Sequence, residues 1–307
     1  MIAVGPHGGD GARLAAALGV EPGGVLDLSA SLNPVAPDVR AVVAAHLDAL
    51  DRYPDPEPAR EALAAALDVE PGRVLLTNGG SEAIALVTAG IGGHVEEPEF
   101  ALHPRGTGPR WRSDPHNPSG RLAAPGEVAG VWDEAFYPLA TGRWTGGRAA
   151  SVVVGSLTKV FACPGLRIGY VVVPERPGVA CSDPPALMAA LRRAQPAWAV
   201  NGLAAAVLPT LLERADLPGW AASVAELRCE LVDLLGRHGF DPAPSDANWV
   251  LVRARGLRDR LACQGVLVRD CTSFGLPDVV RIAVPPPGGH ARLAAAFDAV
   301  RATAVPA

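Results

Sequence analysis

The sequence lacks the features that mark secreted, membrane-spanning and nucleic-acid-binding proteins. It has no run of 18 apolar residues, and residues 1–6 lack the basic start of a signal peptide. Its five cysteines are odd in number, scattered and without metal-type spacing, which predicts reduced thiols rather than disulfides or a metal site. A net charge of −5 gives no reason to expect binding to nucleic acid or to an anionic membrane. We therefore expect a cytoplasmic globular protein.

Lysine is nearly absent as well. Of the 27 lysine and arginine residues, 26 are arginine and only Lys159 is lysine. A guanidinium group stays protonated, whereas a lysine amine can lose its proton and attack a carbonyl group. Lys159 is therefore either a surface residue without a chemical role or a nucleophile.

The setting of Lys159 favours the nucleophile. Val152–Val154 is an apolar run typical of a buried strand, and Ser156 and Thr158 follow at its end. Arg167, whose side chain is suited to binding an anion, lies eight residues after the lysine. The pattern predicts a lysine at the carboxyl end of a strand, next to hydroxyl groups and an anion-binding arginine.

The segment Ser156–Tyr170 resembles the lysine segment of fold type I pyridoxal-phosphate (PLP) enzymes. The resemblance is strongest to the branch that holds histidinol-phosphate aminotransferases and the L-threonine-O-3-phosphate decarboxylases of cobalamin biosynthesis. It implies an α/β fold of the aspartate aminotransferase type, with a mostly parallel mixed sheet in a large domain and a second, small α/β domain. The expected division is an amino-terminal arm in residues 1–36 that forms part of the small domain, a large PLP-binding domain in residues 37–200 and the rest of the small domain in residues 201–307.

A second motif suits the phosphate of such a cofactor. Val74–Thr77 is a predicted strand, Asn78–Gly80 a tight turn, and a predicted helix begins at Ser81. The free N–H groups and the dipole at a helix amino terminus favour a phosphate, although Ser81 could equally be a helix cap alone. The resemblance implies a cofactor site made of Tyr53, Gly80, Ser81, Glu82, Phe100, Asn117, Asp133, Ser156, Thr158, Lys159 and Arg167.

The resemblance also assigns roles around the cofactor ring. Asp133, at the end of a predicted strand, would pair with the pyridine nitrogen and so join Lys159 as a catalytic residue. Asn117 would bond the ring oxygen, and Phe100 would stack on the ring unless it is a core residue. A tyrosine occupies the position of Phe136 in the aminotransferases, so the phenylalanine favours the decarboxylase branch.

Four further residues are assigned to the substrate. His7 and Asn33 belong to the arm that covers the active site in the resembling enzymes, where both lie near the substrate. Arg281 would bind the substrate carboxylate and Arg269 its phosphate, the alternative being two ion-paired structural arginines. Tyr53 would reach the cofactor phosphate of a neighbouring subunit, which predicts a homodimer; otherwise it is a packed residue of an interhelical loop.

The chain departs from the family pattern between about residues 101 and 130. A strand and at least one helix that flank the asparagine-proline turn are missing, or reduced to Trp111–Ser113 and residues 122–130. The leading prediction is a PLP-dependent decarboxylase that converts L-threonine-O-3-phosphate to (R)-1-aminopropan-2-yl phosphate. The alternatives are an aminotransferase of the histidinol-phosphate type and a PLP-binding protein without turnover.

Overall fold

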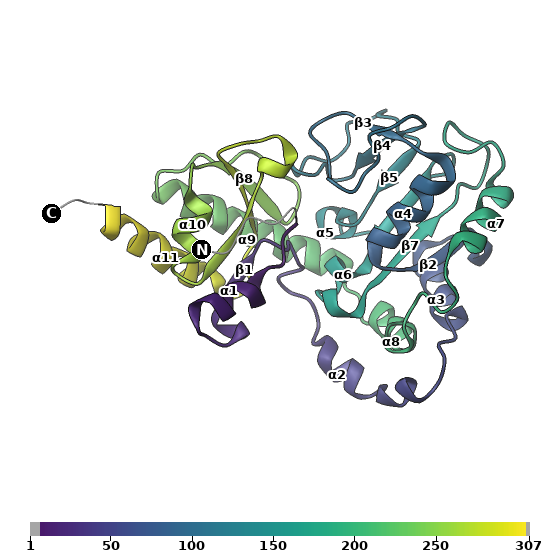
Figure 1. Ribbon diagram of the computed structural model, residues 1–307, viewed down its shortest axis with the longest axis horizontal. Helices are drawn as coiled ribbons and strands as arrows, with labels where there is room; N and C mark the ends of the chain where they lie inside the picture. Colours follow the sequence, from purple (N-terminus) through teal and green to yellow (C-terminus); the bar gives the residue numbers. More distant parts are fainter. Residues whose placement is uncertain (1–6, 305–307) are drawn as a thin grey trace.

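The computed structural model describes residues 7–304, which build two sheets that lie side by side (Figure 1). The larger sheet has six strands in the order β2-β7-β6-β5-β4-β3. Only β7 runs antiparallel to its neighbours, so the sheet is mixed but mostly parallel, as predicted. Its strands are β2 (Val74–Asn78), β3 (His94–Val95), β4 (Arg110–Ser113), β5 (Val131–Asp133), β6 (Val152–Ser156) and β7 (Ile168–Val172).

Helices cover both faces of this sheet. Because successive side chains of a strand point to opposite faces, a strand covered on both sides is apolar throughout. In β6, Val153 packs with α3 and α8 on one face, whereas Val152 and Val154 pack with α4 and α7 on the other. The helices of this part are α2 (Val39–Ala44), α3 (Glu57–Leu67), α4 (Gly79–Ile91), α5 (Tyr137–Thr141), α6 (Leu157–Val160), α7 (Pro184–Ala194) and α8 (Gly202–Glu213).

The smaller sheet combines both ends of the chain. Its order is β1-β9-β10-β8, with β1 parallel to β9 and β10 antiparallel to both of its neighbours. The strands are β1 (Leu26–Leu28), β8 (Trp249–Arg253), β9 (Val266–Asp270) and β10 (Val279–Ala283). The helices around it are α1 (Gly11–Leu18), α9 (Leu217–Arg237), α10 (Leu257–Ala262) and α11 (Gly289–Ala304).

Helix α9 belongs to both bodies. Leu217 and Trp220 pack into the core of the larger sheet together with α8, whereas Leu231 and Leu235 pack into the core of the smaller sheet. The sequence placed α8 in the small domain, after residue 200. From these contacts we propose a domain boundary within α9 instead.

The segment that the sequence showed to be short is short in the structure as well. Residues 96–109, between β3 and β4, contain no helix or strand, and β3 is an edge strand of only two residues. Trp111–Ser113 lies within β4, while residues 122–130 form a loop. The six strands nevertheless pair into one unbroken sheet.

Candidate active site

Lys159 lies where the sequence predicted it, directly after β6 in the short helix α6. Its Nζ donates a hydrogen bond to Ala30 O at 3.1 Å and lies 5.9 Å from the centre of the Phe136 ring. The backbone N–H of Asn33 donates to Lys159 O at 3.0 Å, and the Asn33 amide donates to Val160 O at 2.8 Å. The segment after β1 therefore holds the lysine turn in place.

The surroundings of Lys159 favour its neutral amine. Burial lowers the pKa of Lys159 to about 8, with further lowering by the positive charges of Arg281 and Arg167, while Asp133 and Asp27 oppose the shift. A pKa near 8 leaves about one amine in ten neutral at pH 7, far more than for an exposed lysine. This is the state that a nucleophilic lysine requires.

The predicted phosphate cradle is assembled from three segments. A Cβ atom on Gly79 would lie 2.4 Å from Arg167 Nη2, and one on Gly80 would lie 3.2 Å from Ser156 Cβ. Gly79 also has a φ of +76°, which other residues rarely adopt. The φ of Gly79 therefore favours glycine there, and a side chain at position 80 would have to displace Ser156 slightly.

The donor groups in this cradle suit a phosphate. Helix α4 begins at Gly79, two residues earlier than the sequence indicated, and Ser81 lies in its first turn. Ser156 Oγ and Thr158 Oγ1 are 2.8 Å apart and share a hydrogen bond. Unpaired N–H groups of a helix start, two hydroxyl groups and a guanidinium together form an anion site.

Glu82 has a structural contact in the same turn. Its carboxylate accepts hydrogen bonds from Asn78 N at 2.6 Å and from Gln195 Nε2 at 3.2 Å. These bonds fix the turn that precedes α4. A direct contact of Glu82 with a cofactor stays a prediction.

Asp133 ends β5, the strand next to β6, and is held from two sides. Its Oδ1 accepts a hydrogen bond from Ala135 N at 3.0 Å. Its Oδ2 lies 3.0 Å from His103 Nε2, and because a carboxylate accepts, the imidazole donates. His103 is buried and its ring centre lies 5.4 Å from that of Trp111 and 5.5 Å from that of Phe100.

His103 was not identified from the sequence. It lies in the shortened segment, where no periodic pattern or motif indicates a structure. Its position three residues after Phe100 is the only local signal that could have pointed to it. Phe100 itself is half-buried and lies near the ring of His7, at 6.2 Å between ring centres.

Arg281 occupies the middle of β10 and is only 6% exposed. Its Nη1 donates to Asn117 Oδ1 at 2.7 Å, and its guanidinium carbon lies 4.9 Å from the centre of the Trp249 ring. Among residues 7–304 no carboxylate lies within ion-pair distance of it, and its Nε has no hydrogen-bond partner. Burial lowers the pKa of Arg281 to about 10. A buried guanidinium of this kind is suited to an incoming anion.

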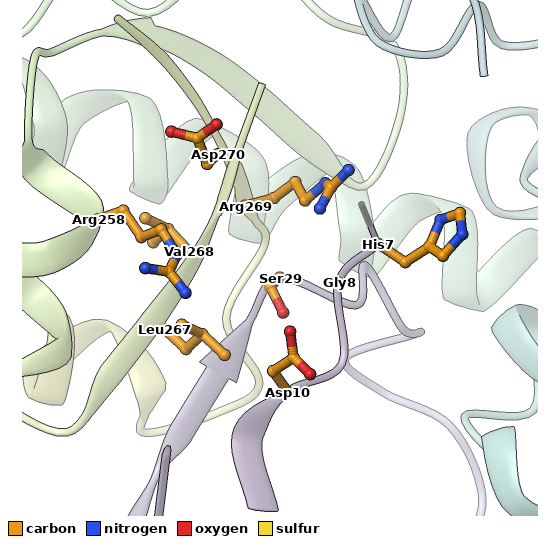
Figure 2. A pocket seen from close by; sticks show the side chains of 9 residues that line it. All are labelled: His7, Gly8, Asp10, Ser29, Arg258, Leu267, Val268, Arg269 and Asp270. Atoms are coloured by element: carbon orange, nitrogen blue, oxygen red, sulfur yellow. The ribbon is translucent and has the colours of Figure 1, made fainter. Parts of the chain in front are cut away.

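Arg269 lies directly opposite Arg281 in the pairing of β9 with β10. Its Nη2 donates to Ser273 Oγ at 2.6 Å, and burial lowers the pKa of its guanidinium. Figure 2 shows the Arg269 side chain pointing toward His7, across a small pocket from Arg258. Burial, and then the charge of Arg269, lowers the pKa of His7. The pocket is lined by His7, Gly8, Asp10, Ser29, Arg258, Leu267, Val268, Arg269 and Asp270.

Tyr53 lies apart from the other predicted site residues. It precedes α3, is 76% exposed and stacks on Trp198, which is 62% exposed, with 4.6 Å between the ring centres. Trp198 has a φ of +55°, an unusual conformation for a large side chain. Contact of Tyr53 with a neighbouring subunit stays a prediction.

The structure thus brings most of the predicted residues to the carboxyl ends of β5 and β6 and the facing side of the small sheet. The amide of Asn33 is occupied by Val160 O and by Val35 N, which donates to its Oδ1 at 3.0 Å, so its expected substrate contact stays a prediction. No helix of the described residues is long and apolar enough to cross a lipid bilayer.

Known proteins resemble this chain in sequence over most of its length. Residues 113–300 match the family model for aminotransferase class I and II. The chain is 28% identical to threonine-phosphate decarboxylase of Salmonella typhimurium, covering 98% of both chains. It is 30% identical to histidinol-phosphate aminotransferase of Thermobifida fusca, covering 86% of both. The alignment with the first relative spans 371 positions, more than the 307 residues of this chain, so that relative contains segments that are missing here.

A solved structure shows the same fold. Histidinol-phosphate aminotransferase from Sinorhizobium meliloti, in complex with pyridoxal 5′-phosphate, superimposes with a TM-score of 0.77 at 18% identity. The match covers 99% of this chain and 96% of the other.

Proposed function

This chain belongs to the aminotransferase class I and II family, with the aspartate-aminotransferase-like fold type I and pyridoxal 5′-phosphate as cofactor, and from this premise we propose that it decarboxylates L-threonine-O-3-phosphate. The product is then (R)-1-aminopropan-2-yl phosphate, an intermediate that serves cobalamin biosynthesis in the resembling enzymes. The family relationship to a threonine-phosphate decarboxylase supports this substrate.

The observation that carries the proposal is the pair of buried arginines. Arg281 and Arg269 are opposite each other on neighbouring antiparallel strands, and both side chains are at most 6% exposed. Like charges directly opposite in a sheet destabilise it, and the charge of Arg269 adds to the lowering of the pKa of Arg281. A substrate with both a carboxylate and a phosphate offers one anion to each guanidinium.

The residues of the chain divide the work of the reaction. PLP supplies the electron sink that takes up the electrons of the broken bond. Gly80, Ser81, Ser156 and Arg167 would bind its phosphate, Asn117 its ring oxygen and Asp133 a proton on its ring nitrogen, with Phe100 against the ring. Lys159, neutral in part near pH 7, would hold the cofactor and then receive or return a proton.

The two arginines would determine which bond breaks. With Arg281 on the carboxylate and Arg269 on the phosphate, the substrate is fixed at two points and cannot rotate freely. Phe136 is a difference from the aminotransferases, because its ring near Lys159 Nζ has no hydroxyl group to donate a hydrogen bond. If the grip of Arg281 turns the carboxylate out of the plane of the cofactor ring, the bond to that carboxylate is the one that would break. We infer from this and from Phe136 that carbon dioxide is lost and that the substrate is not transaminated.

Two other functions are kept as alternatives. Identity to histidinol-phosphate aminotransferase of Thermobifida fusca favours transamination of a phosphorylated amine. The short segment between β3 and β4 favours a PLP-binding protein without turnover, since the enzyme family carries more structure there.

We also propose a homodimer. Tyr53 and Trp198 are exposed and stacked, and Leu50, which is 65% exposed, lies in the same segment as Tyr53. Large apolar side chains gathered on a surface favour a protein partner. A second copy is the occupant that would bring Tyr53 to a cofactor phosphate.

The proposed reaction is tested by measuring carbon dioxide released from carboxyl-labelled L-threonine-O-3-phosphate by the PLP-loaded protein. We expect release without any 2-oxoacid, and none from Lys159→Ala protein. A requirement for 2-oxoglutarate with accumulation of pyridoxamine phosphate would establish the aminotransferase instead. A cofactor spectrum that changes with amines while no product forms would establish a binding protein.

A further inference from the structure

The shortened segment between β3 and β4 is folded around a single arginine. The Arg105 guanidinium donates from Nη1 to the carbonyl groups of Phe100 at 2.9 Å, Ala101 at 3.1 Å and His103 at 2.6 Å. Its Nη2 donates to Glu99 O at 3.0 Å, and its Nε donates to Glu97 Oε1 at 2.8 Å. One side chain therefore satisfies the carbonyl groups that a helix or sheet would satisfy in a regular segment.

A buried glutamate ties this loop to the sheet. Glu99 is 1% exposed, and its carboxylate accepts hydrogen bonds from Ser113 N at 2.9 Å and from Ser113 Oγ at 2.7 Å. Ser113 is the last residue of β4 and lies directly opposite Asp133 in the pairing of β4 with β5. The loop is thus fixed at a point next to the residue that would bind the cofactor ring nitrogen.

His103 connects the loop to Asp133. Its Nε2 is 3.0 Å from Asp133 Oδ2. Its Nδ1 is 3.8 Å from Glu99 Oε1, beyond hydrogen-bond distance, and has no hydrogen-bond partner among the described residues, so Glu99 acts on His103 through its charge and through the shape of the loop. With Ala135 N on the other oxygen, both oxygens of Asp133 have a fixed donor, so the carboxylate cannot rotate freely. Small displacements of a group that acts on a cofactor reduce the rate strongly.

We propose that Glu99 and Arg105 are positioning residues for Asp133, acting through His103. The loop formed by residues 97–105, which contains no helix or strand, supports this side of the site. The proposal rests on the use of PLP at this site but not on the identity of the substrate. It explains how the shortened chain keeps its Asp133 side of the site ordered.

The first test uses the PLP-loaded protein without substrate. A hydrogen-bonded imidazole N–H that exchanges slowly with water gives a low-field proton NMR signal, which His103→Phe identifies by its loss. We expect Glu99→Gln and Arg105→Met to broaden or remove this signal. Arg255→Met is the matched control, since its side chain is 91% exposed, and it is expected to leave the signal unchanged.

The second test separates geometry from charge. Arg105→Lys keeps the positive charge near Glu97, but one ammonium group cannot reach four carbonyl groups and a carboxylate at once. We therefore expect Arg105→Lys to behave like Arg105→Met. A lysine variant with the wild-type NMR signal would show that only the ion pair with Glu97 matters, and the proposal for Arg105 would be wrong.

The third test compares binding with turnover. We expect Glu99→Gln and Arg105→Met to lower kcat by about tenfold, with KM changed less than twofold, because the substrate-binding arginines are untouched. A merely structural role would give a different result. Both variants would then have a lower melting temperature without PLP, but a normal NMR signal and a normal kcat. If Arg105→Met fails to fold, the isosteric Glu99→Gln still decides the question. If the wild-type protein has no decarboxylase activity, the NMR signal still tests this inference while the proposed function falls.

Discussion

Strand β6 and the loop of residues 97–105 support the same site in opposite ways. Strand β6 lies in the middle of the sheet, and its core valines are at most 1% exposed. The loop follows an edge strand and depends on the side chains of Arg105 and Glu99 for its shape. A central strand places the residue at its end through packing that many side chains share. An edge loop places His103 through a few hydrogen bonds, so single substitutions should affect it more selectively.

The largest effect is expected at the end of the central strand. Lys159→Ala should lower activity by roughly a thousandfold or more, because no other side chain in the chain is a primary amine. Borohydride treatment of the wild-type protein, followed by peptide mapping, should find the cofactor on the peptide that contains Lys159. Finding it only on the amino-terminal peptide would contradict the assignment.

A smaller loss is expected one strand away. Asp133→Asn should fold and bind PLP but lose about a hundredfold in kcat, or about 3 kcal/mol of transition-state stabilisation, because an amide cannot balance a protonated ring nitrogen. Melting temperature and PLP content serve as controls for folding. An unchanged kcat would mean that Asp133 has only a structural role at the end of β5. Comparison with Glu99→Gln shows how much of this loss the loop alone can cause.

Substitutions of the two arginines in the smaller sheet should lower kcat/KM by amounts that depend on the substrate. Arg281→Met should lower kcat/KM about a hundredfold for any amino acid, while Arg269→Met should lower it about thirtyfold for phosphorylated substrates only. The comparison is made with matched pairs of phosphorylated and plain amino acids. The protein without PLP should be at least as stable after Arg281→Met, since a buried charge without a carboxylate partner is removed. If Arg269→Met lowered kcat/KM equally for phosphorylated and plain amino acids, the assignment of Arg269 to the substrate phosphate would be wrong.

The smallest effect concerns pH. Because the pKa of Lys159 is lowered to about 8, its amine is mostly protonated below this pH and mostly neutral above it. The rate at which the protein without cofactor takes up added PLP should rise with pH, reach half of its maximum near pH 8 and then level off. In Arg281→Met the midpoint should move to higher pH, because a positive neighbour is removed. A rate that still rises steeply above pH 9 in the wild-type protein would contradict the lowered pKa.

The strand ends could be predicted from sequence because their signals are local. An apolar run marks β6, two glycines mark the start of α4, Asp133 is the last residue of β5, and Lys159 lies in the short helix that follows β6. These features depend on neighbours a few residues away, so composition and spacing are sufficient. The length of the region between Phe100 and Asp133 also predicted a shortened segment, and no helix or strand lies between β3 and β4.

Contacts between distant segments could not be predicted in this way. Nothing near His103 in the sequence indicates Asp133, which is 30 residues away, and nothing near Arg105 indicates that it would fold its own loop. In the same way, nothing near Asn33 in the sequence indicates that its amide holds the turn that carries Lys159, and its expected contact with the substrate stays a prediction.

The sequence by itself determined the chemistry: one lysine at a strand end, one carboxylate, a glycine turn for a phosphate and two arginines in an apolar region. These follow from side-chain identity and local periodicity. The tertiary structure decided what those groups face, placing Arg281 opposite Arg269 and Asp133 against His103. Strand pairing and loop closure bring together residues far apart in the chain, and their energy depends on contacts that no local pattern encodes.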